Sequence, residues 1–372
     1  MRYREFGKLG FRVSQLGFGA MRLPTLKDDK VDYDKAVPLV RRAIDSGVNF
    51  IDSHHFYHQG ESEIAVGKAI KGIRDKVFLQ TKTPLWNKKA DEKTLKKWFE
   101  EALRKLGTDY IDCYLTHSLT WEDWVKKNDL FLCFAQQLKR EGLIRHLGFS
   151  SHDKPENIKK YIDSGEFETM TVQYNLLNQN NEEVISYAAG KGLGVVIMGP
   201  VGGGTLATPS EEINRLIPGG SKSSAEIALR FVLSHPGASV AISGMSNLQQ
   251  LEENVKVAGE EIVLSPEERR RIEGILEEKR RLAELFCTGC GYCMPCPHGV
   301  NIPLKFKQMN LYRVYGLKEY ARKAYLSLSR QGKENLRASA CQECGECEPK
   351  CPQKIPIIKQ LKQVKEIMES TL

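Results

Sequence analysis

Two runs of cysteine near the end of the chain have the spacing of iron–sulfur ligands. Each run ends in Cys-Pro, and the second reads C-x2-C-x2-C-x3-C-P. Four thiolates within so short a segment suit a [4Fe-4S] cluster, whereas a zinc site, the alternative, joins two C-x2-C knuckles across a longer loop. We therefore predict two [4Fe-4S] clusters, with these ligands: Cys287, Cys290, Cys293 and Cys296 in the first run, and Cys341, Cys344, Cys347 and Cys351 in the second.

The two runs are expected to share their ligands. In two-cluster ferredoxins the fourth cysteine of each run ligates the cluster of the other run. That rule assigns Cys351 to the first three cysteines of the first run and Cys296 to the first three of the second. The first run is one residue shorter, C-x2-C-x2-C-x2-C. One cluster beside a degenerate site is therefore the alternative.

A second set of reactive side chains follows short apolar runs earlier in the chain: Asp52, Tyr57, Lys82 and His117. A phenol has an ordinary pKa of about 10, and a Lys ammonium held against it favours the phenolate and lowers that pKa. An Asp carboxylate keeps the Lys charged. The phenol is then a general acid for a carbonyl oxygen, and a His orients that oxygen by a hydrogen bond. Each residue alone has a structural explanation; the four together predict carbonyl chemistry.

Three more histidines lie beside this set, at His54, His55 and His58. They line the mouth of a substrate site, bind a metal, or are ordinary exposed loop histidines. The residue types leave the three interpretations open.

Strands and helices alternate along the first three quarters of the chain. Helical periodicity separates the strand-like runs, as in Lys93–Leu106, and glycines close several of these segments. Eight strands alternating with about eight helices predict an α/β fold, a (β/α)8 TIM barrel whose reactive side chains lie at the strand ends. An open doubly wound sheet is the alternative, but residues 17–22 lack the third glycine of its phosphate turn. The predicted strands are Gln15–Ala20, Asn49–Ser53, Val77–Lys82, Ile111–His117, Ile144–Ser150, Met170–Asn175, Gly194–Pro200 and Val240–Gly244.

The sequence also predicts the first and last elements of the barrel domain. Arg2–Phe11 predicts a hairpin that plugs the barrel floor, and Ser265-Pro266-Glu267-Glu268 predicts the capped start of a last helix, Ser265–Leu282. We place the domains at residues 1–282 (barrel) and 283–372 (ferredoxin-type). The helix-like pattern of Ile302–Arg330 predicts a mostly α-helical iron–sulfur domain.

Composition and charge point to a soluble protein that does not bind nucleic acid. The chain is 41% hydrophobic and carries a formal charge of +8 that is spread along its length. Neither a signal peptide nor a membrane-length apolar stretch is present in the sequence, and the clustered cysteines suggest a reducing compartment, so we expect a cytoplasmic location without membrane binding. After residue 282 there are 14 Lys and Arg against 8 Asp and Glu. This excess offsets anionic clusters or attracts an acidic electron-transfer partner.

Five segments resemble the aldo/keto reductase superfamily: RYREFGKLGFRVSQLGFGAM from Arg2, NFIDSHHFY from Asn49, FLQTK from Phe78, YLTH from Tyr114 and GFSS from Gly148. The resemblance covers about residues 1–280 and is to the subgroup with a C-terminal 4Fe-4S ferredoxin-type domain. It implies the (β/α)8 barrel, carbonyl–alcohol interconversion with NADP or NAD, and the catalytic tetrad Asp52, Tyr57, Lys82 and His117.

The resemblance also implies the cofactor contacts. The family's Ser-Asn pair that holds the carboxamide appears here as two serines, which weakens the second contact. No Arg or Lys occupies the loop that meets a 2′-phosphate in many relatives, so we expect a weak preference for NADPH and that NADH serves. The implied cofactor-binding residues are Ser150, Ser151, Gln173, Met198, Gly199, Pro200, Gly202, Gly203, Ser243, Gly244, Met245, Ser246, Gln250, Glu253 and Asn254.

The clusters add a question to this function. Cubane clusters pass single electrons and nicotinamide passes a hydride, and nothing in the sequence indicates a flavin between them. The clusters exchange electrons with a ferredoxin or flavoprotein partner, brace the structure, or sense oxidants. We predict an NAD(P)H-dependent aldehyde or ketone reductase with a small carbonyl or alcohol substrate. The alternative is a redox-sensing or electron-transfer adaptor that binds nicotinamide without turnover.

Overall fold

The chain forms two compact units, each described by itself below. The computed structural model describes residues 1–28, 30–85, 87, 89–207, 210–214, 223–260, 264–282, 287, 291, 293–329, 336–351 and 354–370. The first unit is Met1–Gly203 with Ala228–Leu264, and the second is Gly204–Ile227 with Ser265–Leu372. The domain boundary placed at residue 282 stays a prediction.

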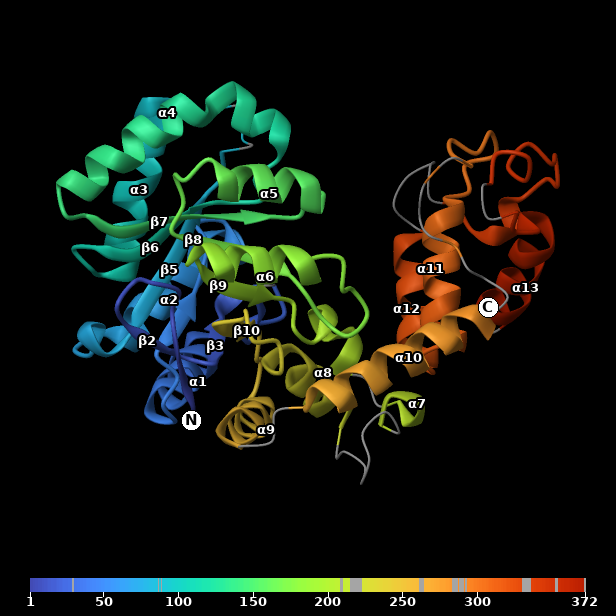
Figure 1. The fold of residues 1–372 in the computed structure, drawn as a ribbon, viewed down its shortest axis with the longest axis horizontal. Coiled ribbons are helices and arrows are strands. Elements are labelled where there is room, and N and C mark those ends of the chain that lie inside the picture. Colours follow the sequence, from blue (N-terminus) through green and yellow to red (C-terminus); the bar gives the residue numbers. More distant parts are fainter. Residues whose placement is uncertain are drawn as a thin grey trace. The chain divides into compact units, whose positions relative to one another are not determined.

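A closed barrel of eight parallel strands forms the first unit (Figure 1). Each predicted strand coincides with one barrel strand, so the predicted (β/α)8 fold is confirmed and the open sheet is wrong. Neighbours along the chain pair in order, and the last strand closes on the first with Ser243 opposite Phe18. The strands are β3 (Leu16–Gly19), β4 (Phe50–Asp52), β5 (Phe78–Thr83), β6 (Ile111–Thr116), β7 (Ile144–Ser151), β8 (Thr169–Gln173), β9 (Gly194–Met198) and β10 (Val240–Ser243).

Helices connect the strands on the outside of the barrel, and their ends follow the expected signals. The predicted segment Lys93–Leu106 is helix α3, which begins after Asp91, whose carboxylate accepts a hydrogen bond from the Thr94 amide at 2.8 Å. It ends at Gly107, where φ is +62°. The other helices are α1 (Tyr33–Asp45), α2 (Glu61–Ile70), α4 (Trp121–Arg140), α5 (Pro155–Asp163), α6 (Glu182–Lys191), α8 (Ser224–Leu233) and α9 (Leu248–Gly259).

The predicted N-terminal hairpin is present as β1 (Tyr3–Glu5) and β2 (Arg12–Ser14). Phe6, between its strands, is completely buried and meets Phe50 and Phe78 with ring centroids 5.6 and 5.4 Å apart. Because these two rings come from barrel strands, the hairpin fills one end of the barrel with aromatic side chains. The carboxyl ends of the strands lie at the opposite end of the barrel, where the active sites of (β/α)8 barrels are found.

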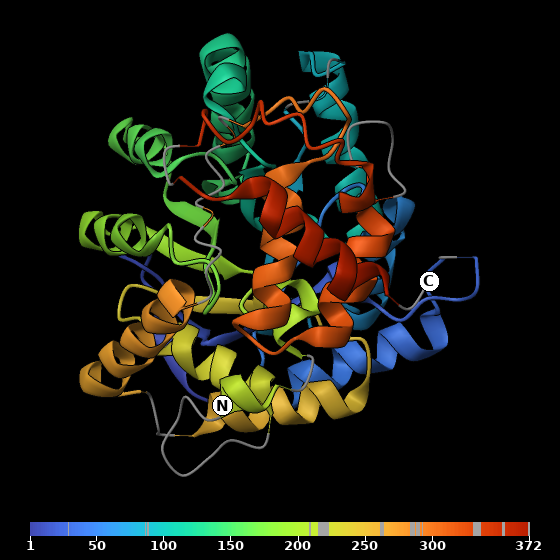
Figure 2. The same cartoon turned by 90° about the vertical axis from the view of Figure 1, so that its right-hand side faces the viewer.

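The second unit is built from helices, as predicted. Helices α11 (Ile302–Arg313), α12 (Lys318–Leu328) and α13 (Ile357–Glu369) pack around one apolar core that includes Phe306, Tyr325 and Leu361 (Figure 2). Helix α10 (Pro266–Leu282) begins with the predicted capping box, in which Ser265 and Glu268 exchange backbone-to-side-chain hydrogen bonds of 2.8 and 3.1 Å. The unit also contains the short helix α7 (Glu211–Asn214). Across the described part of the chain, no helix has the length and apolarity needed to span a membrane.

Candidate active site

Three of the four predicted catalytic residues come from the ends of neighbouring strands. Asp52 ends β4, Lys82 is the penultimate residue of β5 and His117 directly follows β6. Tyr57 begins the short helix η2 (Tyr57–Gly60) that follows β4. Parallel strands bring these ends to the same mouth of the barrel. The structure therefore gathers all four side chains at one end.

Lys82 and Asp52 form a buried ion pair. The ammonium nitrogen donates a hydrogen bond to Oδ1 of Asp52 at 2.5 Å and another to the carbonyl oxygen of Ser53 at 2.9 Å. Both side chains are almost completely buried. Gln80 was absent from the predicted site, yet its amide also donates to Oδ1 of Asp52, at 2.7 Å. The carboxylate is thus held by two donors from β5, and its geometry does not depend on solvent.

Lys82 also faces the ring of Tyr57, with Nζ 5.3 Å from the ring centroid. Burial works against the charge of Lys82, but Asp52 and Tyr57 outweigh it and raise the pKa of this lysine above its ordinary value. Lys82 is therefore a fixed cation at neutral pH.

The pKa of Tyr57 is also raised, chiefly by burial, while the charge of Lys82 pulls it down. Lys82 acts in the predicted direction, but the predicted net lowering is wrong for the free protein. Desolvation of the phenolate is the larger effect because the ring is largely withdrawn from water. At neutral pH Tyr57 therefore carries its proton, the state that a proton donor needs.

Two histidine rings complete this end of the barrel. The ring of His117 lies with its centroid 6.1 Å from that of Tyr57 and 3.9 Å from that of His54. Burial, followed by the charge of Lys82, lowers the pKa of His117 to about 3, so this imidazole is neutral. Burial and the proximity of His117 likewise lower the pKa of His54 strongly. A neutral imidazole can still donate one hydrogen bond to a carbonyl oxygen.

The three neighbouring histidines are not equivalent. His54 and His55 are buried, so the interpretation as exposed loop histidines is wrong for those two. His58 is half-buried. His55 lies between carboxylates, with Nδ1 3.8 Å from Glu63 and Nε2 3.6 Å from Glu101. Among the described residues, no three His, Cys, Asp or Glu side chains are grouped as ligands of a single metal ion.

The hydroxyls of the two serines predicted to hold the carboxamide form hydrogen bonds within the protein. The Ser150 hydroxyl donates to the carbonyl of Thr116 at 3.2 Å, and the Ser151 hydroxyl donates to the carbonyl of Leu119 at 2.7 Å. Both carbonyls flank the turn that carries His117. In this structure the two serines therefore position the loop after β6.

The predicted pyrophosphate loop leaves β9 after Met198. Gly199, Gly202 and Gly203 have φ values of +64°, +61° and +66°, the left-handed region that glycine adopts without strain. The side-chain amide of Asn175 donates to the carbonyl of Gly199 at 2.9 Å and fixes the start of the loop. Gln173 lies at the end of β8, and a Cβ on Gly199 would lie 3.8 Å from its Cγ. The three glycines thus offer backbone without side chains at this end of the barrel, and Pro200 between them is buried.

The predicted adenosine end follows β10. Ser243 is buried and its hydroxyl accepts a hydrogen bond from the Asn254 amide at 3.1 Å. Met245 is completely buried and belongs to the core. The amide and the hydroxyl of Ser246 both bond to Oε1 of Gln250, at 2.9 and 3.1 Å. This loop is therefore closed on itself.

Glu253, the remaining residue predicted at the adenosine end, accepts a hydrogen bond from the Gln249 amide at 2.9 Å. Arg22, which the sequence reasoning missed, lies beside Gly244 at the start of the loop. No local pattern marked it, because Gly244 is 222 positions away in the chain.

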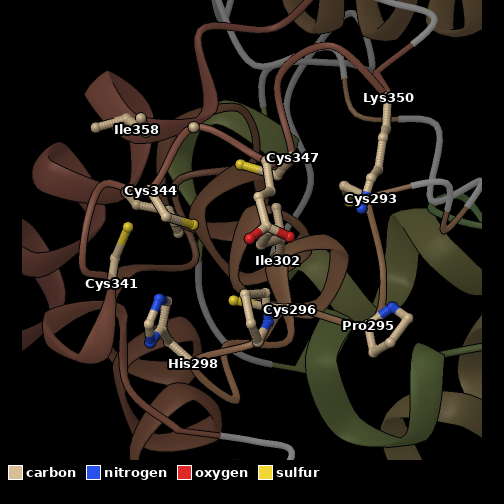
Figure 3. Close-up of a pocket in the computed structure, with 14 residues that line it drawn as sticks. Cys293, Pro295, Cys296, His298, Ile302, Cys341, Cys344, Cys347, Lys350 and Ile358 are labelled. Carbon is tan, nitrogen blue, oxygen red and sulfur yellow. The ribbon is translucent and has the colours of Figure 1, made fainter.

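In the second unit, five predicted ligands line one pocket: Cys293, Cys296, Cys341, Cys344 and Cys347. Figure 3 shows Cys341, Cys344 and Cys347 arranged around the same space as Cys296, although they come from the two different runs. Cys287 and Cys351 pack against the same apolar core as Cys293. Cys290 lies outside the described residues. The structure thus brings the two cysteine runs together.

Comparisons with known proteins agree with both units. The model of the aldo/keto reductase family matches residues 15–277, and the model of a 4Fe-4S dicluster domain matches residues 286–363. An uncharacterized oxidoreductase of Schizosaccharomyces pombe is 31% identical over 287 residues, which cover 73% of this chain and 90% of that protein.

Solved structures resemble the same part of the chain. An aldo-keto reductase from Bacillus halodurans in its holo form has a TM-score of 0.64 and 31% identity, covering 74% of this chain and 96% of its own. An aldo/keto reductase from Klebsiella pneumoniae in complex with NADP and acetate has a TM-score of 0.60 and 27% identity, covering 72% and 93%.

Proposed function

Since the chain belongs to the aldo/keto reductase family, we propose that it interconverts an aldehyde or ketone and the corresponding alcohol with NADH or NADPH. The observation that carries this proposal is the buried pair of Lys82 and Asp52 facing Tyr57. An apolar side chain would pack at this position with a smaller desolvation cost than a buried cation, so packing does not explain a lysine held against a phenol. It suits a phenol that gives and takes a proton.

The proposed reaction divides the work between the cofactor and the chain. When bound, the reduced nicotinamide supplies the hydride that reaches the carbonyl carbon. Tyr57 donates its proton to the carbonyl oxygen, and Lys82 stabilises the phenolate that remains. Neutral His117 donates a hydrogen bond to the same oxygen. In the reverse direction the Tyr57 phenolate takes the proton from the alcohol.

The residues present fit a dinucleotide. Gly199, Gly202 and Gly203 would offer backbone to the pyrophosphate, since a Cβ at Gly203 would meet nothing within 4 Å except Arg22. Gln173 and Met198 end the two strands beside this loop. At the adenosine end the Ser246 donors are engaged by Gln250, which supports the expectation that NADPH preference is weak and that NADH serves.

The cysteines fit iron–sulfur clusters. A cubane presents four iron corners to its ligands, so it needs cysteines placed around a space, as at the pocket of the second unit. Cys296 with Cys341, Cys344 and Cys347 would hold one cluster, and Cys287, Cys290, Cys293 and Cys351 the other. After anaerobic purification, two clusters correspond to about eight iron atoms per chain and one cluster to about four.

The test of the proposed reaction is Tyr57→Phe. This variant keeps the ring and removes the proton, so we expect carbonyl reduction to be lost while nicotinamide still binds, measured by nucleotide fluorescence titration. Tyr110→Phe is the matched control because, among the described residues, its phenol makes no hydrogen bond; it should keep full turnover. Wild-type turnover in Tyr57→Phe would overturn the assignment. Binding without turnover in the wild type, over a panel of aldehydes and ketones, would favour the adaptor.

A further inference from the structure

Arg22 lies across the ends of two barrel strands that are distant in sequence. It ends the short helix η1 (Ala20–Arg22), directly after β3. A Cβ built on Gly244, at the end of β10, would lie 2.7 Å from Cγ of Arg22. Any residue other than glycine at position 244 would push the arginine away. The absence of a side chain at 244 therefore creates the path that Arg22 follows.

The guanidinium reaches the glycine loop after β9. A Cβ built on Gly203 would lie 3.7 Å from Nη2 of Arg22, and it would meet no other atom within 4 Å. Within the part of the chain that the structure describes, this guanidinium makes no hydrogen bond or ion pair. An exposed cation is thus held over bare backbone whose glycines have positive φ values.

The charges of the two cofactor loops indicate a role for Arg22. A dinucleotide brings two negative phosphates, yet the segments 194–207 and 239–255, which contain both cofactor loops, have no Lys or Arg. They contribute only acidic charge, at Glu252 and Glu253. Backbone amides alone would have to balance the pyrophosphate. Arg22 supplies from β3 the cation that these two loops lack.

We propose that Arg22 binds the pyrophosphate of the nicotinamide cofactor. The planar guanidinium can donate two parallel hydrogen bonds to phosphate oxygens, which a single ammonium cannot. The glycine loop supplies the opposite side. The inference rests on the proposed function, because it names a binding residue for that same cofactor. A 2′-phosphate is the less suited ligand, since it belongs to the adenosine end, where Ser246 and Gln250 bond to each other.

The test compares the affinities of three probes for the anaerobically purified full-length protein: NADH, NADPH and ADP-ribose, which keeps the pyrophosphate and lacks nicotinamide. Arg22→Ala should weaken all three by about tenfold or more and by similar factors. Arg22→Lys should recover part of the loss. Arg42→Ala removes an exposed arginine of α1 whose side chain, within the described residues, makes no hydrogen bond or ion pair; it should bind all three probes within about twofold of the wild type.

The outcomes separate the two proposals. Binding by Arg22→Ala within twofold of the wild type overturns the inference alone. A loss confined to NADPH also overturns it and assigns Arg22 to the 2′-phosphate. If the wild type binds none of the probes, the proposed function fails and the inference with it. Equal melting temperatures of wild type and Arg22→Ala exclude misfolding as the cause of a loss, and Arg22→Gln serves if alanine alters the melting temperature.

Discussion

The buried pair of Lys82 and Asp52 makes the sharpest prediction for stability. Asp52→Asn keeps the shape of the side chain and an oxygen for the Gln80 amide, so it removes little besides charge. The buried Lys82 ammonium then has no carboxylate to balance its charge, only neutral oxygen acceptors such as the Ser53 carbonyl at 2.9 Å. Breaking one partner of a buried pair costs about 3–5 kcal/mol. We expect Asp52→Asn to lower the free energy of unfolding by that amount at pH 7.

The pH dependence of this loss tests its cause. In the wild type the folded pKa of Lys82 is raised, so its contribution to stability is present below the unfolded pKa of about 10.4 and is lost above it. In Asp52→Asn only Tyr57 still opposes the effect of burial on Lys82, and we expect the folded pKa of this lysine to fall below the unfolded one. The folded state then binds fewer protons, and stability rises with pH by up to about 1.4 kcal/mol per pH unit. The deficit of the variant should therefore shrink between pH 7 and pH 9.

The measurement is urea unfolding of the barrel, followed by circular dichroism at both pH values. Asp52→Asn with Lys82→Met should be more stable than Asp52→Asn alone, because no uncompensated charge remains. The exposed pair of Glu122 and Lys126, also 2.5 Å apart, is the control: Glu122→Gln should leave the midpoint of urea unfolding almost unchanged. If Asp52→Asn lies within 1 kcal/mol of the wild type at pH 7 and its deficit does not change at pH 9, the reasoning is refuted.

Two further predictions concern the carboxylate behind the site and the clusters. Burial raises the pKa of Glu63 to about 7, above its unfolded value, so its contribution to stability falls as pH rises from about 4.5 to 7. Relative to Glu63→Gln, the wild type should lose up to roughly 3 kcal/mol across that window in urea unfolding; parallel curves would contradict this. Cys344→Ser should lose iron and keep NAD(P)H-linked carbonyl reduction, whereas Cys133→Ser, which changes an exposed cysteine of α4, should keep both. Loss of turnover in Cys344→Ser alone would tie the clusters to catalysis.

The barrel and its charged core were predictable because they follow periodic rules. Alternating apolar runs fix the strands, and parallel strands bring Asp52, Lys82 and His117 to one end. Gln80 carried a usable signal that was not exploited: two positions before Lys82, it lies on the same face of β5. A polar residue at that spacing from a catalytic lysine is a candidate for its hydrogen-bond network.

Other features required the folded structure. Residue types give the direction in which Lys82 acts on Tyr57, but only three-dimensional burial shows that desolvation is larger. The serines at 150 and 151 match a cofactor motif in sequence, yet their hydroxyls bond the loop after β6. Arg22 gains its position from a glycine 222 residues later in the chain. Such contacts arise from closure of the barrel and leave no local pattern.

The functions proposed for the two units use different kinds of redox chemistry, and this difference limits how the units can cooperate. In the proposed reaction Asp52, Tyr57, Lys82 and His117 move protons and stabilise charge, and none of them exchanges single electrons. Hydride transfer moves two electrons together, whereas a cubane cluster passes one at a time. Reduced clusters alone therefore cannot drive the carbonyl reaction proposed for the barrel without a carrier that converts between the two modes. If electrons from a ferredoxin or flavoprotein are to reach the carbonyl reaction through the clusters, that carrier is required. A structural role for the clusters requires none.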